Sequence, residues 1–315
     1  TADKTLELAE VPTPQLRAGE VLVKVHATGV NRADLLQAAG YYPPPPGESE
    51  IMGLECAGEI VDAGDTDRGE KVACLLAGGG YAEYVAVPAG QLLPIPEGYS
   101  YEQAAAVVEV AATVWSNLGM LTGLAAGQTV LIHGGAGGIG TFAIQLAKHL
   151  GAQVAVTAGS VEKLEACRRL GADILINYRE ENFADVLKNR CDRILDIIGA
   201  KYLDQNVTAL APDGHMVIIG MQGGVKGELN IGKLLAKRGT ISATALRARS
   251  HDDKARIVAD TIKHVWPLLA DGTITHQLHD TLPLADAARA HELLRSGAVT
   301  GTLVLNVCSN EASKG

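Results

Sequence analysis

The sequence predicts an α/β protein in which a doubly wound parallel sheet is inserted into a β-rich domain that forms a small, partly open barrel. Two observations carry this prediction. Strand-like and helical stretches alternate between residues 129 and 246, and the chain before this block is rich in β-type alternation, glycine and proline. We therefore expect a β-rich domain over residues 1–108 and 247–315, and an α/β domain over residues 109–246.

The first segment alternates in the manner of strands. Its clearest strand is residues 21–25, VLVKV. Residues 31–39 predict a short helix, and the four consecutive prolines at 43–46 predict a stiff, extended loop. Further strands are expected at residues 59–61, 71–76 and 81–87. Glycine and proline separate these strands at the interval typical of a small barrel.

From residue 100 the pattern changes to helix, with alanine-rich helices expected at 101–110 and 111–121. The alternating block follows, with strands at 129–133, 153–157, 173–177, 192–198, 215–220 and 240–246, and helices at 141–150, 161–170, 182–188, 202–210 and 233–237. Such alternation implies a parallel sheet covered on both faces by right-handed crossovers. The chain then returns to a helix from 252, a β segment at 278–282, a helix at 284–295 and a last strand at 301–307.

The stretch TVLIHGGAGGIGTFAIQLAKHL, residues 129–150, predicts a strand, a glycine turn and a helix. In its G-x-G-x-x-G pattern the first glycine allows the tight turn, the second lets the backbone approach a pyrophosphate, and the third lets the helix pack on the strand. Free amides at the helix start favour an anion. The positions expected to bind a dinucleotide are Gly135, Gly137, Gly138, Ile139 and Gly140. The alternative is a glycine turn with a packing role alone.

The end of the second strand indicates which nucleotide is bound. An NAD site usually has Asp or Glu there to accept a hydrogen bond from the ribose 2′-hydroxyl, whereas this strand runs into Ser160 with no acid and Lys163 follows. This favours NADP(H). Ser160 could instead cap the next helix, and Lys163 could be a solvated surface charge. Tyr178 could stack near the adenosine or pack as a half-buried ring.

Composition limits the class of protein. The net charge of −9, with no block of Lys or Arg, argues against a nucleic-acid surface. The absence of a long apolar run and of a signal peptide leads us to expect a cytoplasmic protein. The five cysteines are scattered along the sequence, and this spacing is typical neither of a disulfide framework nor of a zinc cluster. Cys56 and Cys74 are expected to be buried packing residues.

Several motifs together carry a family resemblance. They are GEVLVKVHATGVNRADLLQAAGYYPPPPG, GLECAGEI, PIPEGYS, GQTVLIHGGAGGIG, ILDIIG and TGTLVLNV, in this order. On these motifs the sequence resembles the zinc-free quinone oxidoreductase branch of the medium-chain dehydrogenase/reductase superfamily, and most closely its tumour-suppressor-inducible type. The resemblance covers nearly the whole chain and implies a Rossmann domain inserted in a GroES-like catalytic domain.

The resemblance also implies that no metal is bound. Alcohol dehydrogenases of this superfamily hold a catalytic zinc with a Cys where this chain has Asn31 and a His where it has Leu54, and their lobe of clustered cysteines is missing here. Without thiolate and imidazole ligands a tetrahedral zinc site cannot form. A quinone needs only a positioned hydride and a proton donor, which fits a metal-free cleft between the domains.

By resemblance, Asn31 and Tyr42 line the pocket of the substrate and nicotinamide, and Tyr42 donates to or orients the quinone oxygen. A tyrosine packed on the proline loop is the alternative. The resemblance places Thr113 at the nicotinamide end, and Gly220 and Met221 beside the carboxamide.

Three further expectations concern charged or polar positions. Arg247 or Arg249 reaches the 2′-phosphate or a loop carbonyl, with a surface charge as the equal alternative. His133 is expected to be a core histidine whose ring nitrogens are hydrogen-bonded, and not a catalytic base. Gly137 stands where close relatives have a serine, so any catalytic help from that serine is missing here.

The resemblance implies an NADPH-dependent enzyme that transfers hydride to quinones. Two alternatives stay open: a reductase of enones or enoyl thioesters, for which we find no basic site for thioester phosphates, and a low-turnover NADPH-binding sensor or structural protein. We expect a homodimer, because the strand at 240–246 is an apolar sheet edge. The partners expected are a small-molecule quinone or a related electrophile, with no nucleic acid and no membrane.

Overall fold

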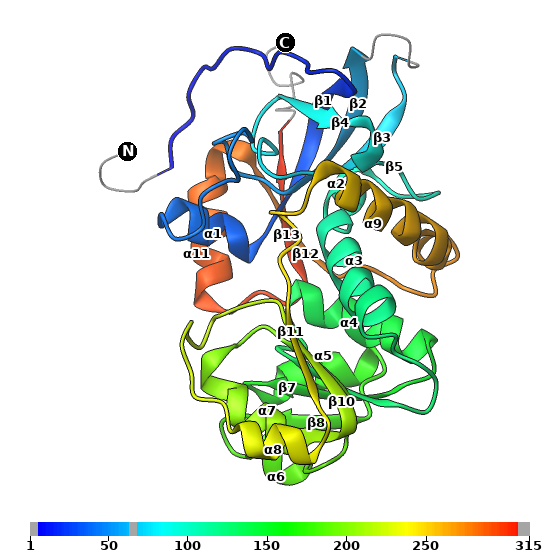
Figure 1. The fold of residues 1–315 in the computed structure, drawn as a ribbon. Coiled ribbons are helices and arrows are strands. Elements are labelled where there is room, and N and C mark those ends of the chain that lie inside the picture. Colours follow the sequence, from blue (N-terminus) through cyan, green and yellow to red (C-terminus); the bar gives the residue numbers. More distant parts are fainter. Residues whose placement is uncertain (1–5, 63–67, 308–315) are drawn as a thin grey trace. The chain divides into compact units, whose positions relative to one another are not determined.

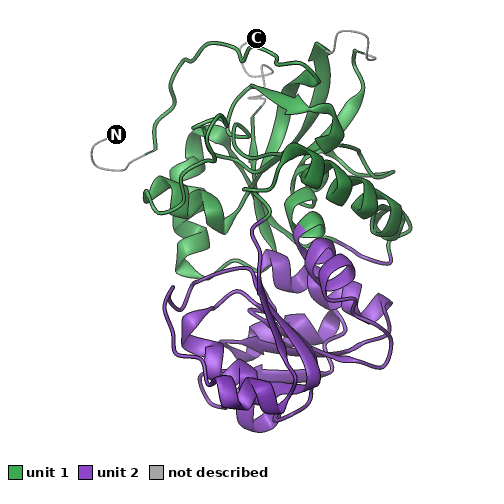
Figure 2. Ribbon diagram, in the orientation of Figure 1, with its two compact units in different colours: residues 1–112, 246–272, 276–315 green, residues 113–245, 273–275 purple. Residues whose placement is uncertain are grey.

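The computed structural model describes residues 6–62 and 68–307, and Cys308 lies outside these ranges. The chain divides into two compact units, coloured in Figure 2: unit 1 is Thr1–Ala112, Leu246–Gly272 and His276–Gly315, and unit 2 is Thr113–Ala245 and Thr273–Thr275. These limits lie within a few residues of the expected ones. The short piece 273–275 joins unit 2 because the Gln145 side chain bonds the backbone of Thr275 in both directions, at 2.9 Å each.

Unit 1 is built on a seven-stranded sheet in the order β12-β13-β1-β2-β3-β5, with β4 also paired to β1. Its strands are β1 (Glu20–Val30), β2 (Glu55–Asp62), β3 (Lys71–Leu75), β4 (Tyr84–Pro88), β5 (Leu92–Pro94), β12 (Leu278–Pro283) and β13 (Thr302–Asn306). Strand β13, from the far end of the chain, lies beside β1 (Figure 1). The alternating apolar residues of β1, such as Val21, Val23 and Val25, lie in a buried cluster with β2, β3 and β4.

The helices of unit 1 are α1 (Arg32–Ala38), η1 (Ala89–Gln91), α2 (Tyr101–Ala105), α9 (His251–His264), α10 (Trp266–Ala270), η4 (Leu284–Asp286) and α11 (Ala287–Ser296), and α3 (Val108–Val114) crosses into unit 2. Serines begin two of them: Ser100 and Ser250 each accept a backbone N–H three residues later, at 3.3 and 3.2 Å. The strand expected at 81–87 begins only at Tyr84, because the Tyr81 N–H donates to the Met52 carbonyl at 2.9 Å and the pairing with β1 starts at Tyr84.

Unit 2 holds a six-stranded, wholly parallel sheet in the order β11-β10-β9-β6-β7-β8. The strands are β6 (Thr129–His133), β7 (Gln153–Ala158), β8 (Ile174–Asn177), β9 (Cys191–Asp196), β10 (Leu210–Ile218) and β11 (Thr240–Ala243). The helices are η2 (Trp115–Leu121), α4 (Gly138–His149), α5 (Val161–Arg169), α6 (Phe183–Val186), η3 (Ala200–Tyr202), α7 (Leu203–Ala209) and α8 (Ile231–Ala236). The order reverses at β6, so the predicted doubly wound α/β fold is confirmed.

The segment before β6 is apolar and includes a rare type of helix. Residues Trp115–Leu121 form a π-helix, where the sequence predicted an ordinary helix. Any side chain at Gly119 would meet the Trp115 ring within 2.5 Å, so glycine lets the wider turn close over the indole. By length and composition alone, the described helical stretch Tyr101–Leu121 could cross a membrane; its 18-residue window has a mean hydropathy of 1.4, and 72% of that window is buried inside the protein.

Candidate dinucleotide and substrate site

Of the three motif glycines in the turn after β6, the protein itself requires Gly135 and Gly140 but not Gly137. A Cβ at Gly140 would lie 2.4 Å from a backbone oxygen of the turn, and one at Gly135 would lie 2.9 Å from Val156. A Cβ at Gly137 would meet nothing closer than 3.6 Å. Gly137 precedes α4 as its N-cap with no capping side chain. Its missing side chain therefore leaves space next to the free amides of the helix, as the approach of a phosphate requires.

The turn after β7 gathers three of the predicted residues. The Ser160 hydroxyl accepts the N–H of Lys163 at 3.4 Å, so the helix-cap alternative for Ser160 is confirmed. Tyr178, 46% exposed, lies against the same turn, since a Cβ at Gly159 would be 2.5 Å from its hydroxyl. Arg179, which sequence reasoning missed, reaches the same glycine, with its Nε 3.4 Å from that Cβ position. Binding of a 2′-phosphate by these residues stays a prediction.

Of the positions predicted for the nicotinamide end, Gly220 and Met221 lie on the loop after β10, and Thr113 lies on α3. Gly220 follows the end of β10, and a Cβ there would be 2.7 Å from the carbonyl oxygen of Ile197 in the loop after β9. Met221 beside it is 57% exposed. Thr113 is buried, and its carbonyl accepts hydrogen bonds from Asn117 at 2.8 Å and Ser116 at 3.2 Å. Their contacts with a cofactor stay predictions.

In unit 1, Asn31 lies between two buried acids that sequence reasoning missed. Its side-chain amide donates to Glu55 Oε1 at 2.8 Å, and its backbone N–H donates to Asp34 Oδ2 at 2.8 Å. Burial raises the pKa of Glu55 to about 8, helped by the nearby Glu109 carboxylate, and burial raises the pKa of Asp34 to about 6. Glu55 therefore holds a proton at neutral pH, next to the predicted pocket residue.

Tyr42 and Arg247 form a second group in unit 1. The Arg247 guanidinium lies 5.2 Å from the centre of the Tyr42 ring and donates to the Tyr42 carbonyl at 3.0 Å and the Ala77 carbonyl at 2.7 Å. A third bond, at 2.7 Å, goes to Gln37. Arg247 is only 4% exposed, so the surface-charge alternative is wrong and the loop-carbonyl alternative is confirmed. Contact of Arg247 with a cofactor phosphate stays a prediction.

The phenol of Tyr42 keeps its proton at neutral pH. Burial raises its pKa, and Arg247 lowers it by a smaller amount. The Glu109 carboxylate, which also acts on Glu55, raises the pKa of Tyr42 further. The Glu109 carboxylate thus raises the pKa of both Tyr42 and Glu55, the partner of Asn31. A hollow of about 310 Å³ lies elsewhere in unit 1, between Arg17, Glu48 and Gly79.

Comparison with known proteins identifies the family. Residues 17–97 match the alcohol dehydrogenase GroES-like domain, and residues 138–263 match the family described as zinc-binding dehydrogenase. A quinone oxidoreductase of Pseudomonas aeruginosa is 33% identical over 296 residues, which are 91% of this chain and 90% of that protein. The chain belongs to the medium-chain dehydrogenase/reductase superfamily. Within it, the tumour-suppressor-inducible type stays a prediction.

Two further relatives of this superfamily differ in kind. The crystal structure of an Escherichia coli quinone oxidoreductase complexed with NADPH superposes with a TM-score of 0.84 at 28% identity, covering 95% of both chains. A highly reducing polyketide synthase of Emericella nidulans is 34% identical over 312 residues, 94% of this chain. The chain spans only 12% of that synthase, and 14% of the mycobacterial polyketide synthase subunits that it also matches.

The residues present do not fit the zinc implied by the family description. At the positions where zinc-binding members supply ligands, this chain has the Asn31 amide and the apolar, buried Leu54. Glu55 already accepts from Asn31 and from the Glu109 N–H at 2.8 Å each. Within residues 6–62 and 68–307, no group of three or more His, Cys, Asp or Glu side chains could hold a metal ion. We therefore assign no step of the reaction to a metal.

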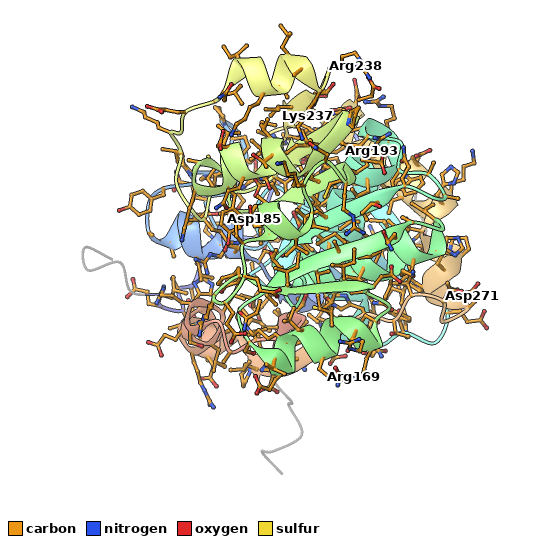
Figure 3. All side chains as sticks on the ribbon, turned by 90° about the horizontal axis from the view of Figure 1, so that it is seen from below. Arg169, Asp185, Arg193, Lys237, Arg238 and Asp271 are labelled. Atoms are coloured by element: carbon orange, nitrogen blue, oxygen red, sulfur yellow. The ribbon has the colours of Figure 1, made fainter. Side chains whose placement is uncertain are left out.

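Figure 3 labels four basic side chains of unit 2: Arg169 at the end of α5, Arg193 on β9, and Lys237 and Arg238 between α8 and β11. Arg193 donates to the Thr122 carbonyl at 2.7 Å, and Arg238 pairs with Asp213 at 2.7 Å. Lys237 bonds the carbonyls of Thr208 and Leu210 near the end of α7. These groups stabilise the fold and lie at the opposite edge of the sheet from the predicted dinucleotide site.

Proposed function

We propose that this protein is an NADPH-dependent reductase that transfers hydride to quinones without a metal. The observation that carries the proposal is the turn after β7, where Ser160 stands in the place of the acid of an NAD site, Lys163 follows in the first turn of α5 and Tyr178 lies against Gly159. An acidic side chain there would repel a 2′-phosphate, whereas a lysine attracts it. The quinone oxidoreductases among the relatives, and the NADPH complex of one of them, support the same function.

In this proposal, unit 2 binds the cofactor and unit 1 binds the acceptor. The backbone amides at Gly137, Gly138 and Ile139 hold the pyrophosphate, which the open space at Gly137 admits. When bound, NADPH supplies the hydride. Tyr42 keeps its phenolic proton at neutral pH and donates a hydrogen bond to the carbonyl oxygen of the quinone.

The other groups of unit 1 orient the acceptor. Arg247 fixes the Tyr42 backbone and faces its ring, which limits the positions that the phenol can take. Asn31 is fixed by Glu55 and Asp34, so that its amide is held in place before the acceptor arrives. Because Glu55 is protonated at neutral pH, its own side chain adds no charge beside Asn31.

A second function, reduction of enones or enoyl thioesters, is favoured by the 34% identity to a highly reducing polyketide synthase. It would use the same cofactor site and the same donor, since hydride addition to an activated double bond also needs a proton donor beside a carbonyl. A low-turnover NADPH-binding protein is the third possibility. A homodimer is also part of the proposal and rests on the sheet edge discussed below, and the cytoplasmic location is proposed from the sequence alone.

The experiment is a parallel measurement of NADPH and NADH oxidation with 1,4-benzoquinone, 9,10-phenanthrenequinone, a simple enone and an enoyl thioester, with chelator present. We expect turnover of a quinone, with NADPH preferred. The variant Tyr42→Phe should lower kcat about a hundredfold and leave the Kd of NADPH unchanged. Preferential reduction of the enone or thioester would favour the second function, and NADPH binding with no turnover on any acceptor would refute both.

A further inference from the structure

Four polar side chains form a continuous chain under the carboxyl edge of the sheet in unit 2, and the function proposed above does not use them. They are Thr157 at the end of β7, His133 at the end of β6, Asn206 on α7 and Asp196 at the end of β9, and none is more than 1% exposed. Buried polar groups destabilise a core unless they are hydrogen-bonded, so a chain of four suggests a role beyond packing.

The hydrogen bonds of this chain have one possible direction. Asp196 accepts the backbone N–H groups of Ile198 at 2.7 Å and Gly199 at 3.1 Å, and it also accepts the Asn206 side-chain N–H at 3.2 Å. The remaining oxygen of the Asn206 amide is 2.7 Å from His133 Nε2, which must therefore carry the ring proton. His133 Nδ1 is then the acceptor for the Thr157 hydroxyl at 3.0 Å. Burial lowers the pKa of His133 to about 4, so the ring is neutral, as this pattern requires.

The first end of the chain holds the glycine turn. The Thr157 hydroxyl oxygen accepts the N–H of Gly134 at 3.4 Å, and the Thr157 carbonyl accepts the N–H of Gly135 at 3.0 Å. These are the first residues of the turn that is predicted to hold the pyrophosphate. The turn therefore starts at a place set by Thr157 and His133.

The second end of the chain holds the loops predicted for the nicotinamide. Asp196 binds the loop after β9 through Ile198 and Gly199. That loop in turn supports the loop after β10, because the Ile197 carbonyl accepts the N–H of Gln222 at 3.2 Å and the Ile198 carbonyl accepts that of Gly223 at 2.7 Å. Gly220 and Met221 belong to this second loop. Asn206 is the side chain that joins the two ends.

We propose that Asn206 is a positioning residue, which through His133 and Asp196 keeps the glycine turn at a fixed separation from the loops after β9 and β10, so that both halves of one dinucleotide are bound together. The inference rests on the proposed function, since it takes unit 2 to bind NADPH. A residue in this role acts on ligands that contact both places and has no effect on a ligand that contacts only the first.

The test compares two ligands on the variant Asn206→Ala. The first is NADPH, and the second is adenosine 2′,5′-bisphosphate, which has the adenosine half of NADPH and no nicotinamide. By isothermal titration calorimetry, we expect the Kd of NADPH to rise about tenfold and that of the bisphosphate to stay within about twofold of wild type. A residue that served stability alone would lower Tm and weaken both ligands alike, or neither.

The matched control is Ser242→Ala, which removes another hydrogen bond between a histidine and a side-chain oxygen in the same sheet, 2.8 Å from His215 Nε2. It should leave both Kd values unchanged. If Asn206→Ala does not fold, Asn206→Ser should give the same difference between the ligands with a smaller loss of Tm, since a hydroxyl and a water can fill the space.

Equal weakening of the two ligands in a folded Asn206 variant, or no weakening of NADPH, overturns the inference. Wild-type protein that binds neither ligand overturns the proposed cofactor together with it. Wild-type protein that binds NADPH but reduces no quinone contradicts only the proposed reaction, because both readouts here are binding constants.

Discussion

Replacing Glu55 with glutamine should change the dependence of stability on pH. The pKa of Glu55 is about 8 in the folded protein, because its carboxyl group is buried and lies near Glu109, and it is near 4.5 when exposed. Between these two values the folded protein holds a proton that the unfolded chain has released. The stabilisation is therefore fully present below about pH 4.5, decreases as pH rises, and is lost once pH has passed about 8.

The magnitude follows from the two pKa values. Each tenfold difference in proton affinity corresponds to about 1.4 kcal/mol, so the Glu55 carboxyl alone should lower the free energy of unfolding by about 3–4 kcal/mol between pH 5 and pH 8. Glutamine cannot ionise and lacks this contribution. Its side-chain NH₂ also cannot accept the Glu109 N–H, which costs about 1–3 kcal/mol, but equally at both pH values.

The assay is urea unfolding of wild type and Glu55→Gln at pH 5 and pH 8, followed by tryptophan fluorescence. The stability of wild type relative to the variant should be lower at pH 8 than at pH 5 by about 3–4 kcal/mol. The exposed Glu97→Gln serves as the control and should show no such change. An infrared carbonyl band of a protonated carboxyl group, absent from the variant, should accompany the effect. A relative stability that is the same at both pH values would show that Glu55 is ionised and refute the reasoning.

Three further predictions concern the cofactor site and the sheet edge. Gly140→Ala should lower the free energy of unfolding by about 3 kcal/mol, because its Cβ would overlap the turn. Gly137→Ala should lower it by about 1 kcal/mol or less and raise the Kd of NADPH at least about tenfold. The reverse order in urea unfolding and calorimetry would contradict the assigned roles. Lys163→Gln should raise KM about tenfold for NADPH and leave KM for NADH unchanged, and an equal rise for both would remove Lys163 from the phosphate site. β11 ends the sheet with no further strand among the described residues, and α8 before it exposes Ile231 and Leu235. Light scattering should therefore give a mass of twice 32.8 kDa for wild type and the mass of a monomer for the double variant Ile231→Lys/Leu235→Lys. A monomeric wild type would refute the dimer.

The sequence predicted what depends on local pattern. The alternation between residues 129 and 246 specified the parallel sheet, because each strand and crossover helix has its own apolar period. Ser160 was recognisable as a helix cap from its place before Val161, and His133 as a core histidine from the apolar strand that it ends. Cys56 and Cys74 are buried, as expected from their apolar neighbours.

The sequence did not predict what depends on distant partners. Glu55 is bonded by Asn31 and by Glu109, 24 and 54 residues away, and no local period encodes such bonds. The available signal was an acid inside the apolar stretch GLECAGEI, and likewise Asp196 inside ILDIIG. Arg247 binds carbonyls 170 and 205 residues away, so sequence alone could not choose between its alternatives.

The pairing of β1 with β13 sets an order in which the protein can mature during synthesis. Residues 27–30 need residues 303–306 as partners, so the sheet of unit 1 cannot be completed until residue 306 has left the ribosome. All the strands of unit 2 lie between Thr129 and Ala243, so that sheet can form while the rest is still being translated. Until then residues 27–30 of β1 present an uncovered strand edge, and the nascent chain is most exposed to aggregation and to chaperones in this interval.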